Sequence, residues 1–192
     1  MSFAALPPPL LTLSGIAVRR GGRLLFEGFD LYLRPGQAVV VTGPNGVGKS
    51  SLLRVAAGLL TPAAGRVERV EAAALADENP ALDPRRTLAQ ALGFWAGLDG
   101  ATPALAAMGL DSLAEVPVRL LSTGQRKRAV LARVIASGAP LWLLDEPVNG
   151  LDGDGAARLT AAMATHRAGG GAILAASHQP LGLENAETVM LG

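Results

Sequence analysis

One short segment carries the residue types that bind the phosphates of a nucleotide: Gly43, Pro44, Asn45, Gly46, Val47, Gly48, Lys49 and Ser50. It fits the pattern G-x-x-x-x-G-K-[ST], in which glycines let backbone N–H groups approach phosphate, the lysine reaches the outer phosphates and the serine hydroxyl ligates magnesium. The adjoining Ser51 extends the set of predicted nucleotide contacts. The segment therefore predicts a site for ATP or GTP together with Mg²⁺.

The elements around this segment come in the order that a phosphate loop requires. The apolar run 38–41 has the length and β-branched content of a buried strand, and residues 51–57 continue as a helix with its apolar positions on one face. This order directs the positive end of the helix dipole at a bound anion. The alternative is a glycine-rich turn in an ordinary α/β protein.

A second strand, expected at 141–144, ends in the two carboxylates of Asp145 and Glu146. Open α/β sheets bind ligands at the carboxyl ends of their strands. In phosphate-loop enzymes an aspartate there holds magnesium, and an adjacent carboxylate orients and activates the attacking water. We therefore predict Ser50 and Asp145 as magnesium ligands and Glu146 as a catalytic residue. Alternatively, Asp145 and Glu146 form a polar strand end before a turn at Pro147.

Length and composition exclude several other classes of protein. A chain of 192 residues fits one compact domain and is too short for a motor domain plus a substrate domain. It has no cysteine, which excludes a disulfide framework and cysteine metal sites. The net charge is +1, and the arginines are scattered, so the basic stripe of a nucleic-acid binder is missing. We expect no nucleic-acid partner.

The beginning of the chain does not resemble a targeting signal. Residues 1–9 lack a basic leader followed by an apolar stretch, and three consecutive prolines at 7–9 would break a signal-peptide helix. No run approaches the roughly 20 apolar residues of a membrane span. We therefore expect a cytoplasmic protein without a span, whose association with a membrane would be peripheral.

The order of predicted elements indicates an α/β core interrupted by a helical insert. We expect antiparallel strands at 10–18 and 28–33 joined by a turn at 20–23, followed by the phosphate loop, its helix and a further strand pair within 65–75. Residues 87–138 read as mostly helical, with breaks at 100–103 and 116–117. A second α/β half then follows, with a strand at 141–144, a helix at 155–167 and strands at 172–176 and 187–191.

Three further motifs, taken in order with the first two, resemble those of the ATP-binding-cassette (ABC) ATPases. The segment 121–125, LSTGQ, resembles the signature sequence LSGGQ, with Thr123 in place of the first glycine. Residues 149–152, NGLD, resemble the D-loop, and Ser177-His178 resembles the switch histidine. The resemblance implies one ABC domain over 1–192: a RecA-like core of the P-loop NTPase type, an N-terminal antiparallel β part, and a helical subdomain inserted at roughly 80–138.

The resemblance also implies a head-to-tail dimer that encloses two ATP molecules. Ser122, Gly124 and Gln125 would then bind the nucleotide held by the phosphate loop of the second chain. His178 would contact the γ-phosphate, and Asp152 would couple the two sites, while Glu146 would act as the general base. Taken singly, Ser122 and Thr123 also suit helix caps, and His178 suits a solvated loop. Both lysines of the chain, Lys49 and Lys127, lie in or beside these phosphate-associated motifs.

Two positions depart from the usual pattern of the family. The glutamine that touches magnesium and the attacking water is replaced by Asn79, which we predict as a catalytic residue and magnesium ligand. Its side chain is one methylene shorter, and a displacement of about 1 Å can cost a large factor in rate. Slow or partner-dependent hydrolysis would follow. The aromatic residue that stacks on adenine is replaced by Arg20, whose planar guanidinium suits either that stacking or a solvated turn.

A narrower resemblance is to the small ATP-binding subunit of the haem exporter of cytochrome c maturation. It rests on the segments 20–28 and 177–181, on Arg20 and on the end of the chain just after the last strand. The implied partners are integral membrane subunits at the cytoplasmic face of the bacterial inner membrane, and the implied process is haem export or release of a haem carrier. The chain itself shows no haem site, because His166 falls in an expected surface helix where it would be solvated.

Two other functions fit the same residues. The chain would use identical chemistry as the ATPase of another small-molecule ABC transporter. A regulatory module that closes on ATP but scarcely hydrolyses it is the third reading. The chain has the residues expected of a hydrolysing ATPase, which argues against that module; they are Lys49, Asp145, Glu146 and His178. Asn79 favours the module.

Overall fold

An antiparallel sheet forms one side of the protein, as seen in a computed structural model that describes residues 7–70 and 72–192. Its strands are β1 (Leu11–Arg20), β2 (Arg23–Leu33) and β4 (Ala64–Arg69), in the order β2-β1-β4. β1 and β2 form a hairpin, and Arg20 lies opposite Arg23 at its tip. The predicted antiparallel pair and its turn are confirmed, although both strands are longer than expected.

The second sheet has five parallel strands and provides the edge at which the phosphate loop and the carboxylates meet. The strands are β3 (Ala38–Thr42), β5 (Ala73–Ala76), β6 (Leu141–Asp145), β7 (Ala172–Ala176) and β8 (Glu187–Met190). Their order is β5-β6-β7-β3-β8. β7 is buried along its whole length, as expected for a parallel strand covered on both faces.

The strand pair predicted within 65–75 is wrong, because its two strands enter different sheets. β4 pairs antiparallel with β1, with Val67 opposite Leu13, whereas β5 pairs parallel with β6, with Ala74 opposite Trp142. The chain crosses from one sheet to the other between them. Each strand satisfies its backbone hydrogen bonds with a partner distant in sequence, which a local pattern does not reveal.

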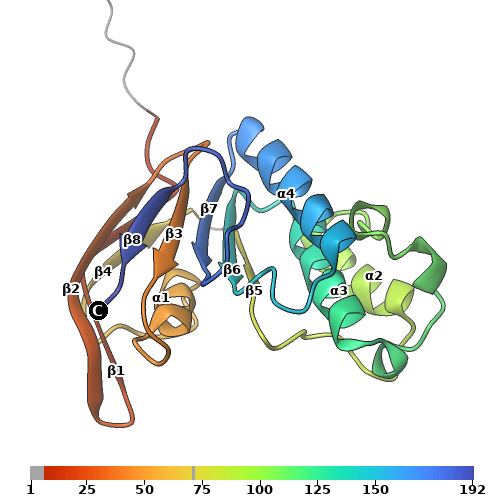
Figure 1. Ribbon diagram of the computed structural model, residues 1–192, viewed down its shortest axis with the longest axis horizontal. Coiled ribbons are helices and arrows are strands. Elements are labelled where there is room, and N and C mark those ends of the chain that lie inside the picture. The colour runs from red at the N-terminus through yellow and green to blue at the C-terminus, as the bar shows by residue number, and fades with distance from the viewer. Residues whose placement is uncertain (1–6, 71) are drawn as a thin grey trace, which may run out of the picture.

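Helix α1 (Lys49–Ala56) lies between the two sheets, and its apolar side packs against both of them (Figure 1). Leu141 and Leu143 of β6 point into this core, which also contains Leu52 and Leu53 of α1. Alternate residues of the same strand point to the opposite face of the sheet. The phosphate loop is therefore anchored at both ends, by the inner strand β3 and by the buried side of α1.

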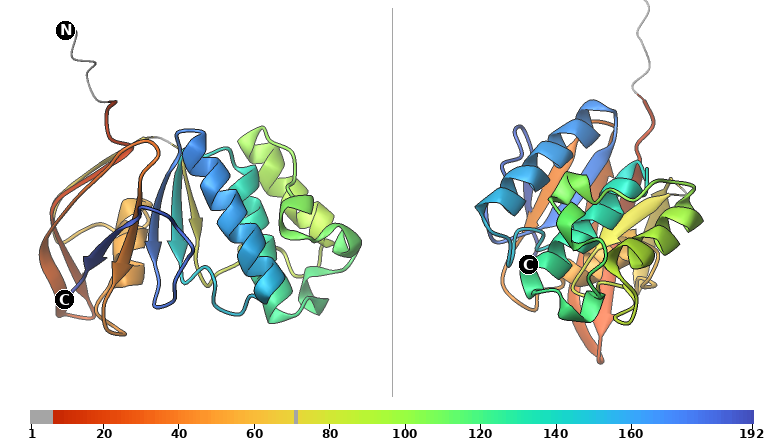
Figure 2. Two further views of the ribbon diagram at one scale, coloured as in Figure 1. Left: turned by 45° about the horizontal axis from the view of Figure 1, so that its top comes forward. Right: turned by 90° about the vertical axis from the view of Figure 1, so that its right-hand side faces the viewer.

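The opposite face of the parallel sheet is covered by helices. They are α2 (Leu88–Asp99), α3 (Thr123–Ala136) and α4 (Gly153–Ala168), with three short 3-10 turns between α2 and α3 at Ala106–Met108, Asp111–Leu113 and Val118–Leu120. The second core joins Trp142 and Leu144 of β6 to residues of all three helices. α2 lies farthest from the sheet, beyond α3 (Figure 2).

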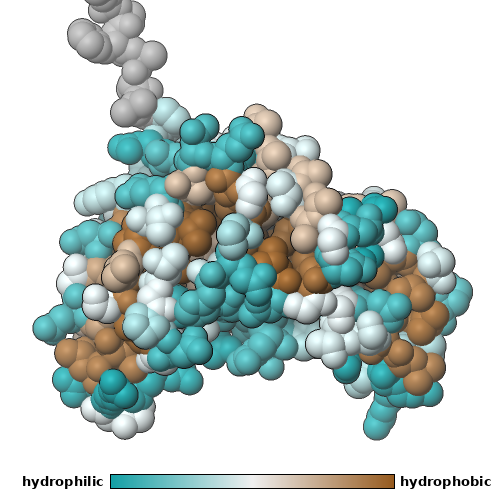
Figure 3. Space-filling model, in the orientation of Figure 1, coloured by the Kyte–Doolittle hydropathy of each residue, from teal (hydrophilic) through white to brown (hydrophobic). Residues whose placement is uncertain are grey.

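The described residues contain no helix that is both long enough and apolar enough to cross a membrane. Apolar side chains nevertheless reach the surface at the helical end of the molecule, at the right of Figure 3. Phe94 and Leu98 of α2 and Leu120 of the third 3-10 turn are all exposed.

Candidate nucleotide-binding site

The phosphate loop turns tightly between β3 and α1, and two of its glycines have no room for a side chain. Gly43 has φ +140°, and a Cβ atom there would lie 2.3 Å from the carbonyl oxygen of Leu191. Gly48, the residue before α1, has φ +119°, and its Cβ would lie 2.8 Å from the ring of Phe26. These positive φ angles and close approaches are the conditions that only glycine meets without strain.

Lys49 is folded into the loop, with 8% of its surface exposed. Its Nζ donates to the carbonyl oxygens of Gly43 and Pro44, at 2.7 and 3.1 Å, and lies 2.9 Å from Nε2 of His178. An ammonium group can only donate, so Nε2 accepts and the proton of a neutral ring is on Nδ1. The lysine thus connects the phosphate loop to the switch histidine.

Glu146 lies beside the same histidine. Its Oε2 accepts a hydrogen bond from the backbone N–H of His178 at 3.3 Å, and its Oε1 is 3.6 Å from Nε2 of that ring. Because Nε2 accepts from Lys49, we do not assign an ion pair to the longer contact. Glu146 has φ +43°, in the left-handed region that is sparsely populated by residues other than glycine. Such strain is typical of functional sites.

These groups surround a cavity of about 250 Å³ at the carboxyl edge of the parallel sheet. The cavity is lined by Leu25, Asn45, Gly46, Gly48, Lys49, Ser50, Ser51, Asp145, Glu146 and His178. The structure therefore brings together residues from β2, the phosphate loop, the end of β6 and the segment after β7. Sequence reasoning missed Leu25 and the neighbouring Phe26; their signal was the apolar run that follows the hairpin turn.

Asn79 and Arg20 are outside the lining of this cavity. Asn79 is exposed, its backbone N–H donates to Oδ1 of Asp77 at 2.9 Å, and it lines a larger groove of about 610 Å³ between α1 and the helical part. Arg20 is exposed at the tip of the β1–β2 hairpin. The structure thus leaves both residues apart from Lys49 and Glu146.

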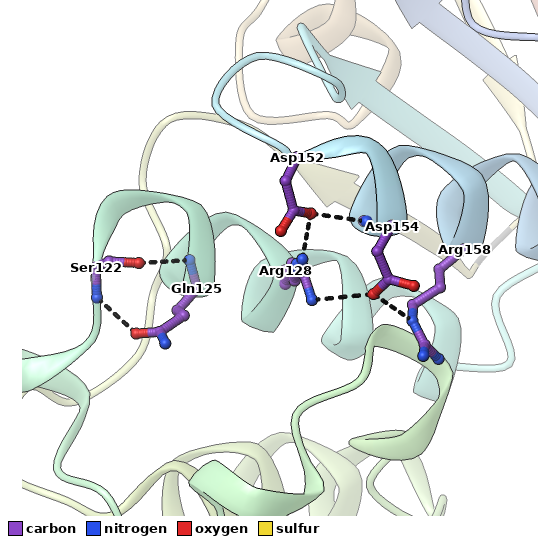
Figure 4. Close-up of polar contacts among 7 residues, drawn as sticks. Ser122, Gln125, Arg128, Asp152, Asp154 and Arg158 are labelled. Carbon is purple, nitrogen blue, oxygen red and sulfur yellow. Dashed lines mark hydrogen bonds and ion pairs between the residues drawn. The ribbon is translucent and has the colours of Figure 1, made fainter.

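The signature segment lies at the start of α3, where its side chains cap the helix (Figure 4). The Ser122 hydroxyl accepts from the backbone N–H of Gln125 at 3.2 Å, and the Gln125 side chain accepts from the backbone N–H of Ser122 at 2.8 Å. This reciprocal pair is a capping box. Ser122 therefore has the capping role that its residue type suggested, whereas Thr123 is the first residue of the helix. Neither Ser122 nor Gln125 lines the phosphate cavity of its own chain.

The D-loop aspartate caps the next helix. Oδ1 of Asp152 accepts from the backbone N–H of Gly155 at 2.8 Å and also pairs with the Arg128 guanidinium. The Gly155 hydrogen bond and then the arginine lower the pKa of this carboxyl group. Within the same loop, Oδ1 of Asn149 accepts from the Gln179 side chain at 3.1 Å, which connects the D-loop to the segment after His178.

The second lysine lies outside the phosphate cavity, against the backbone at the end of β6. Nζ of Lys127, on α3, donates to the carbonyl oxygen of Asp145 at 3.1 Å. Burial lowers the pKa of this lysine, and the nearby charges of Asp145, Glu146 and Asp77 oppose that shift. The association of Lys127 with phosphate, suggested by its place beside the signature segment, is therefore not supported within one chain.

The expectation that His166 is solvated is wrong. Its ring stacks on Trp142, with the ring centroids 3.9 Å apart and the planes 10° from parallel, and Nε2 lies 3.3 Å from the carbonyl oxygen of Ala172. Burial lowers the pKa of this histidine. The helix was predicted correctly, but the ring faces the sheet because it covers the buried tryptophan of β6.

The fold and the cavity define a nucleotide-binding domain of the ABC ATPase class, and the family profile described as "ABC transporter" matches residues 26–149. Two similar proteins are each named cytochrome c biogenesis ATP-binding export protein CcmA. The protein from Sphingopyxis alaskensis is 55% identical, covering 95% of this chain and 97% of the relative. That from Zymomonas mobilis is 51% identical, covering 92% and 81%. The chain belongs to this family of ABC ATP-binding proteins.

Solved structures agree on the fold. An ATP-binding subunit of an ABC transporter superimposes with a TM-score of 0.85 at 23% identity, covering 95% of this chain and 85% of the other. A dimeric ATP-binding cassette in a post-hydrolysis state with ADP and phosphate gives 0.80 at 19% identity, covering 94% of each chain. The predicted fold class and family are confirmed.

Proposed function

We propose that this chain is the ATP-hydrolysing subunit of a membrane ABC exporter that serves cytochrome c biogenesis. The observation that carries the proposal is the cavity in which Lys49, Asp145, Glu146 and His178 meet. The names of the relatives supply the pathway. Haem, or a haem carrier that the complex releases, is the cargo we infer, and the rest of the exporter would supply the contacts to it.

Nucleotide binding would begin at Lys49. The ammonium exchanges its carbonyl partners in the loop for the outer phosphates, which offer stronger, charged acceptors. The N-terminus of α1 adds its unpaired N–H groups and its dipole. We place the adenine against the tip of the β1–β2 hairpin, where Arg20 would stack on it and Leu25 would line the approach.

Mg²⁺ fits the donors present, because Ser50 and Asp145 line the same cavity and offer the hard oxygen ligands that this ion prefers. Bound there, it would neutralise charge on the β- and γ-phosphates. Asn79 would complete the set only after the segment 77–80 moves toward the cavity. This movement makes hydrolysis depend on what occupies the neighbouring groove.

Glu146 would act as the general base. It accepts a proton from the attacking water, the water oxygen bonds to the γ-phosphorus, and the bond from that phosphorus to the bridging oxygen breaks to release ADP and phosphate. The backbone N–H of His178 holds the carboxylate in place. The His178 ring, beside Lys49, would contact the γ-phosphate and respond to its loss.

The working unit we infer is a head-to-tail homodimer. Ser122, Gly124 and Gln125 would bind the nucleotide held by the second chain, with the N-terminus of α3 directed at its γ-phosphate. Asp152 would lie at the dimer interface and couple the two sites. Ser122 and Thr123 are exposed and lie outside the cavity of their own chain, which supports this arrangement.

The groove beside Asn79 is our proposed contact for integral membrane subunits. It is lined by residues of α1, β5, α2 and α3, among them Arg54, Trp95 and Arg133, and by Leu59 in the segment after α1. A helix of a membrane subunit would lie in it and move the insert, roughly 80–138, relative to the core. The chain would then work peripherally, at the cytoplasmic face of the bacterial inner membrane and without a nucleic-acid partner.

The first experiment compares Mg²⁺-dependent ATP hydrolysis by the wild type and Glu146→Gln, with light scattering to follow ATP-induced dimers. We expect turnover by the wild type, and loss of turnover with accumulation of a dimer in the variant. Glu68→Gln, an exposed glutamate of β4, is the matched control and should behave as the wild type. Normal turnover by Glu146→Gln would remove Glu146 as the base, and co-purification with membrane subunits tests the pathway.

A second candidate function is an ATP-dependent regulatory module that closes but scarcely hydrolyses. The position of Asn79 outside the cavity favours it. In that case wild type and Glu146→Gln would both bind ATP without turnover, and adding the membrane subunits would not produce hydrolysis.

A further inference from the structure

The signature helix α3 touches the D-loop and the start of α4 at two places where no side chain fits between them. A Cβ atom on Gly124 would lie 2.8 Å from the carbonyl oxygen of Gly150 in the D-loop. A Cβ atom on Gly155, in the first turn of α4, would lie 2.9 Å from Nε of Arg128. Gly124 therefore allows α3 to approach the backbone of the D-loop directly, and Gly155 leaves room for the Arg128 side chain.

Arg128 connects the two segments at the second place (Figure 4). One guanidinium nitrogen, Nη2, binds Oδ1 of Asp152, and the other, Nη1, lies 3.4 Å from Oδ2 of Asp154. Its side chain is only 15% exposed, because it lies over the glycine turn at the start of α4. A planar fork that binds two carboxylates specifies their geometry in a way that a single point charge does not.

Asp154 extends the connection to a second part of the helical insert. Oδ2 of Asp154 also binds Nε of Arg158 at 2.8 Å. Nη1 of Arg158 donates to the carbonyl oxygen of Ala106, in the first 3-10 turn after α2, at 3.3 Å. A continuous series of polar contacts thus runs from α3 through the start of α4 to the 3-10 turn at Ala106–Met108.

Exposed ion pairs contribute little to stability, and both aspartates are more than half exposed. The arrangement of these pairs therefore points to orientation as their main effect. Asp152, which caps α4, is one of the two aspartates that Arg128 binds, so the direction in which the D-loop enters α4 depends on this contact.

We propose that Arg128 is a positioning residue, which holds the D-loop against the signature helix so that both segments reach the second chain's nucleotide as one unit. The proposal rests on the head-to-tail dimer of the proposed function. Arg128 itself would touch neither nucleotide. Its loss would leave the phosphate loop intact but misplace Asp152 relative to Ser122 when the dimer closes.

The test uses the full chain with Mg²⁺ and ATP, in the variants Arg128→Met and Arg128→Lys. We expect kcat to fall by about tenfold or more in Arg128→Met, since misplacement of about 1 Å produces losses of this order, while KM and the monomer's affinity for ATP stay within about twofold. Arg128→Lys keeps the charge without the fork and should recover only part of kcat. Arg66→Met, at an exposed arginine of β4, is the matched control.

Three results separate the possibilities. The proposed function fails if the wild type does not hydrolyse ATP and the Glu146→Gln variant forms no dimer with ATP. This proposal then fails with it. If the wild type hydrolyses and Arg128→Met has the same kcat, only the role of Arg128 is overturned. Should Arg128→Met not fold, a double-mutant cycle in kcat between Arg128→Lys and Asp152→Asn decides, because independent effects would contradict the proposal and strong coupling would support it.

Discussion

At the residue scale, Lys49 is the side chain that connects the parts of the predicted phosphate site. Its ammonium holds two loop carbonyls and the His178 ring, so the side chain is already directed at the place where phosphates would bind. His178 in turn donates its backbone N–H to Glu146. The three side chains that would bind, sense and hydrolyse ATP are therefore joined before a nucleotide arrives.

Replacement of Lys49 tests this arrangement. In Lys49→Ala the ammonium is lost, and we expect the affinity for ATP to fall by about tenfold or more, because a charge-assisted contact to phosphate contributes roughly 1.5–3 kcal/mol. Titration calorimetry with ATP measures the change. Lys127→Ala removes the other lysine, which lies behind the cavity, and should retain ATP binding; equal losses in both variants would contradict the assignment.

His166 makes a prediction about pH. Burial holds its folded-state pKa below the ordinary value of 6.5, so as pH falls below about 6.5 the unfolded chain takes up a proton that the folded protein resists. Stability from the neutral ring is complete above that pH and is lost as pH falls toward the folded pKa. His166→Phe should flatten the change in melting temperature between pH 7.5 and 5.5. An unchanged slope would mean that other groups cause it.

At the element scale, the direct packing of the signature helix on the D-loop depends on a glycine. Gly124→Ala would place a methyl group 2.8 Å from the Gly150 carbonyl, backbone that cannot move aside without displacing the D-loop. We expect lower kcat together with a loss of about 1–3 kcal/mol in stability, the usual cost of overpacking. ATPase assays and denaturant unfolding provide the two measurements.

The matched control lies in the neighbouring helix. Gly93 is inside α2 and has open space around its Cα, so Gly93→Ala should stabilise the protein by about 0.5–1 kcal/mol through helix propensity. If both alanine variants had the same effect on unfolding, the close approach at Gly124 would not be what limits that position.

At the scale of the whole molecule, the groove between core and insert is the place where an outside partner could act on both. Leu59 lines it and is 70% exposed, an unusual position for a leucine. Leu59→Glu should abolish co-purification with the membrane subunits, because it adds a charge to an apolar contact. Tyr32→Glu, at an exposed residue of β2 outside the lining of the groove, is the control. Retained binding by Leu59→Glu would exclude the groove as the contact.

The family and the phosphate loop were predictable because their signal is local. A phosphate loop is eight consecutive residues whose contacts to phosphate come mainly from their own backbone, so spacing alone identifies the motif. The strands at 141–144 and 172–176 were equally predictable from the sequence, since parallel strands buried on both faces are continuous apolar runs. The order of five motifs then determined the class of protein.

Tertiary structure decided which distant segments meet. β4 and β5 each pair with a strand distant in sequence, in different sheets. His166 stacks on Trp142, and Lys127 donates to the backbone carbonyl of Asp145, which are also contacts between residues far apart in the chain. The same is true of Arg128, whose role depends on a carboxylate 24 residues away. Sequence patterns report the local preferences of the backbone, whereas these contacts depend on how layers of structure pack together.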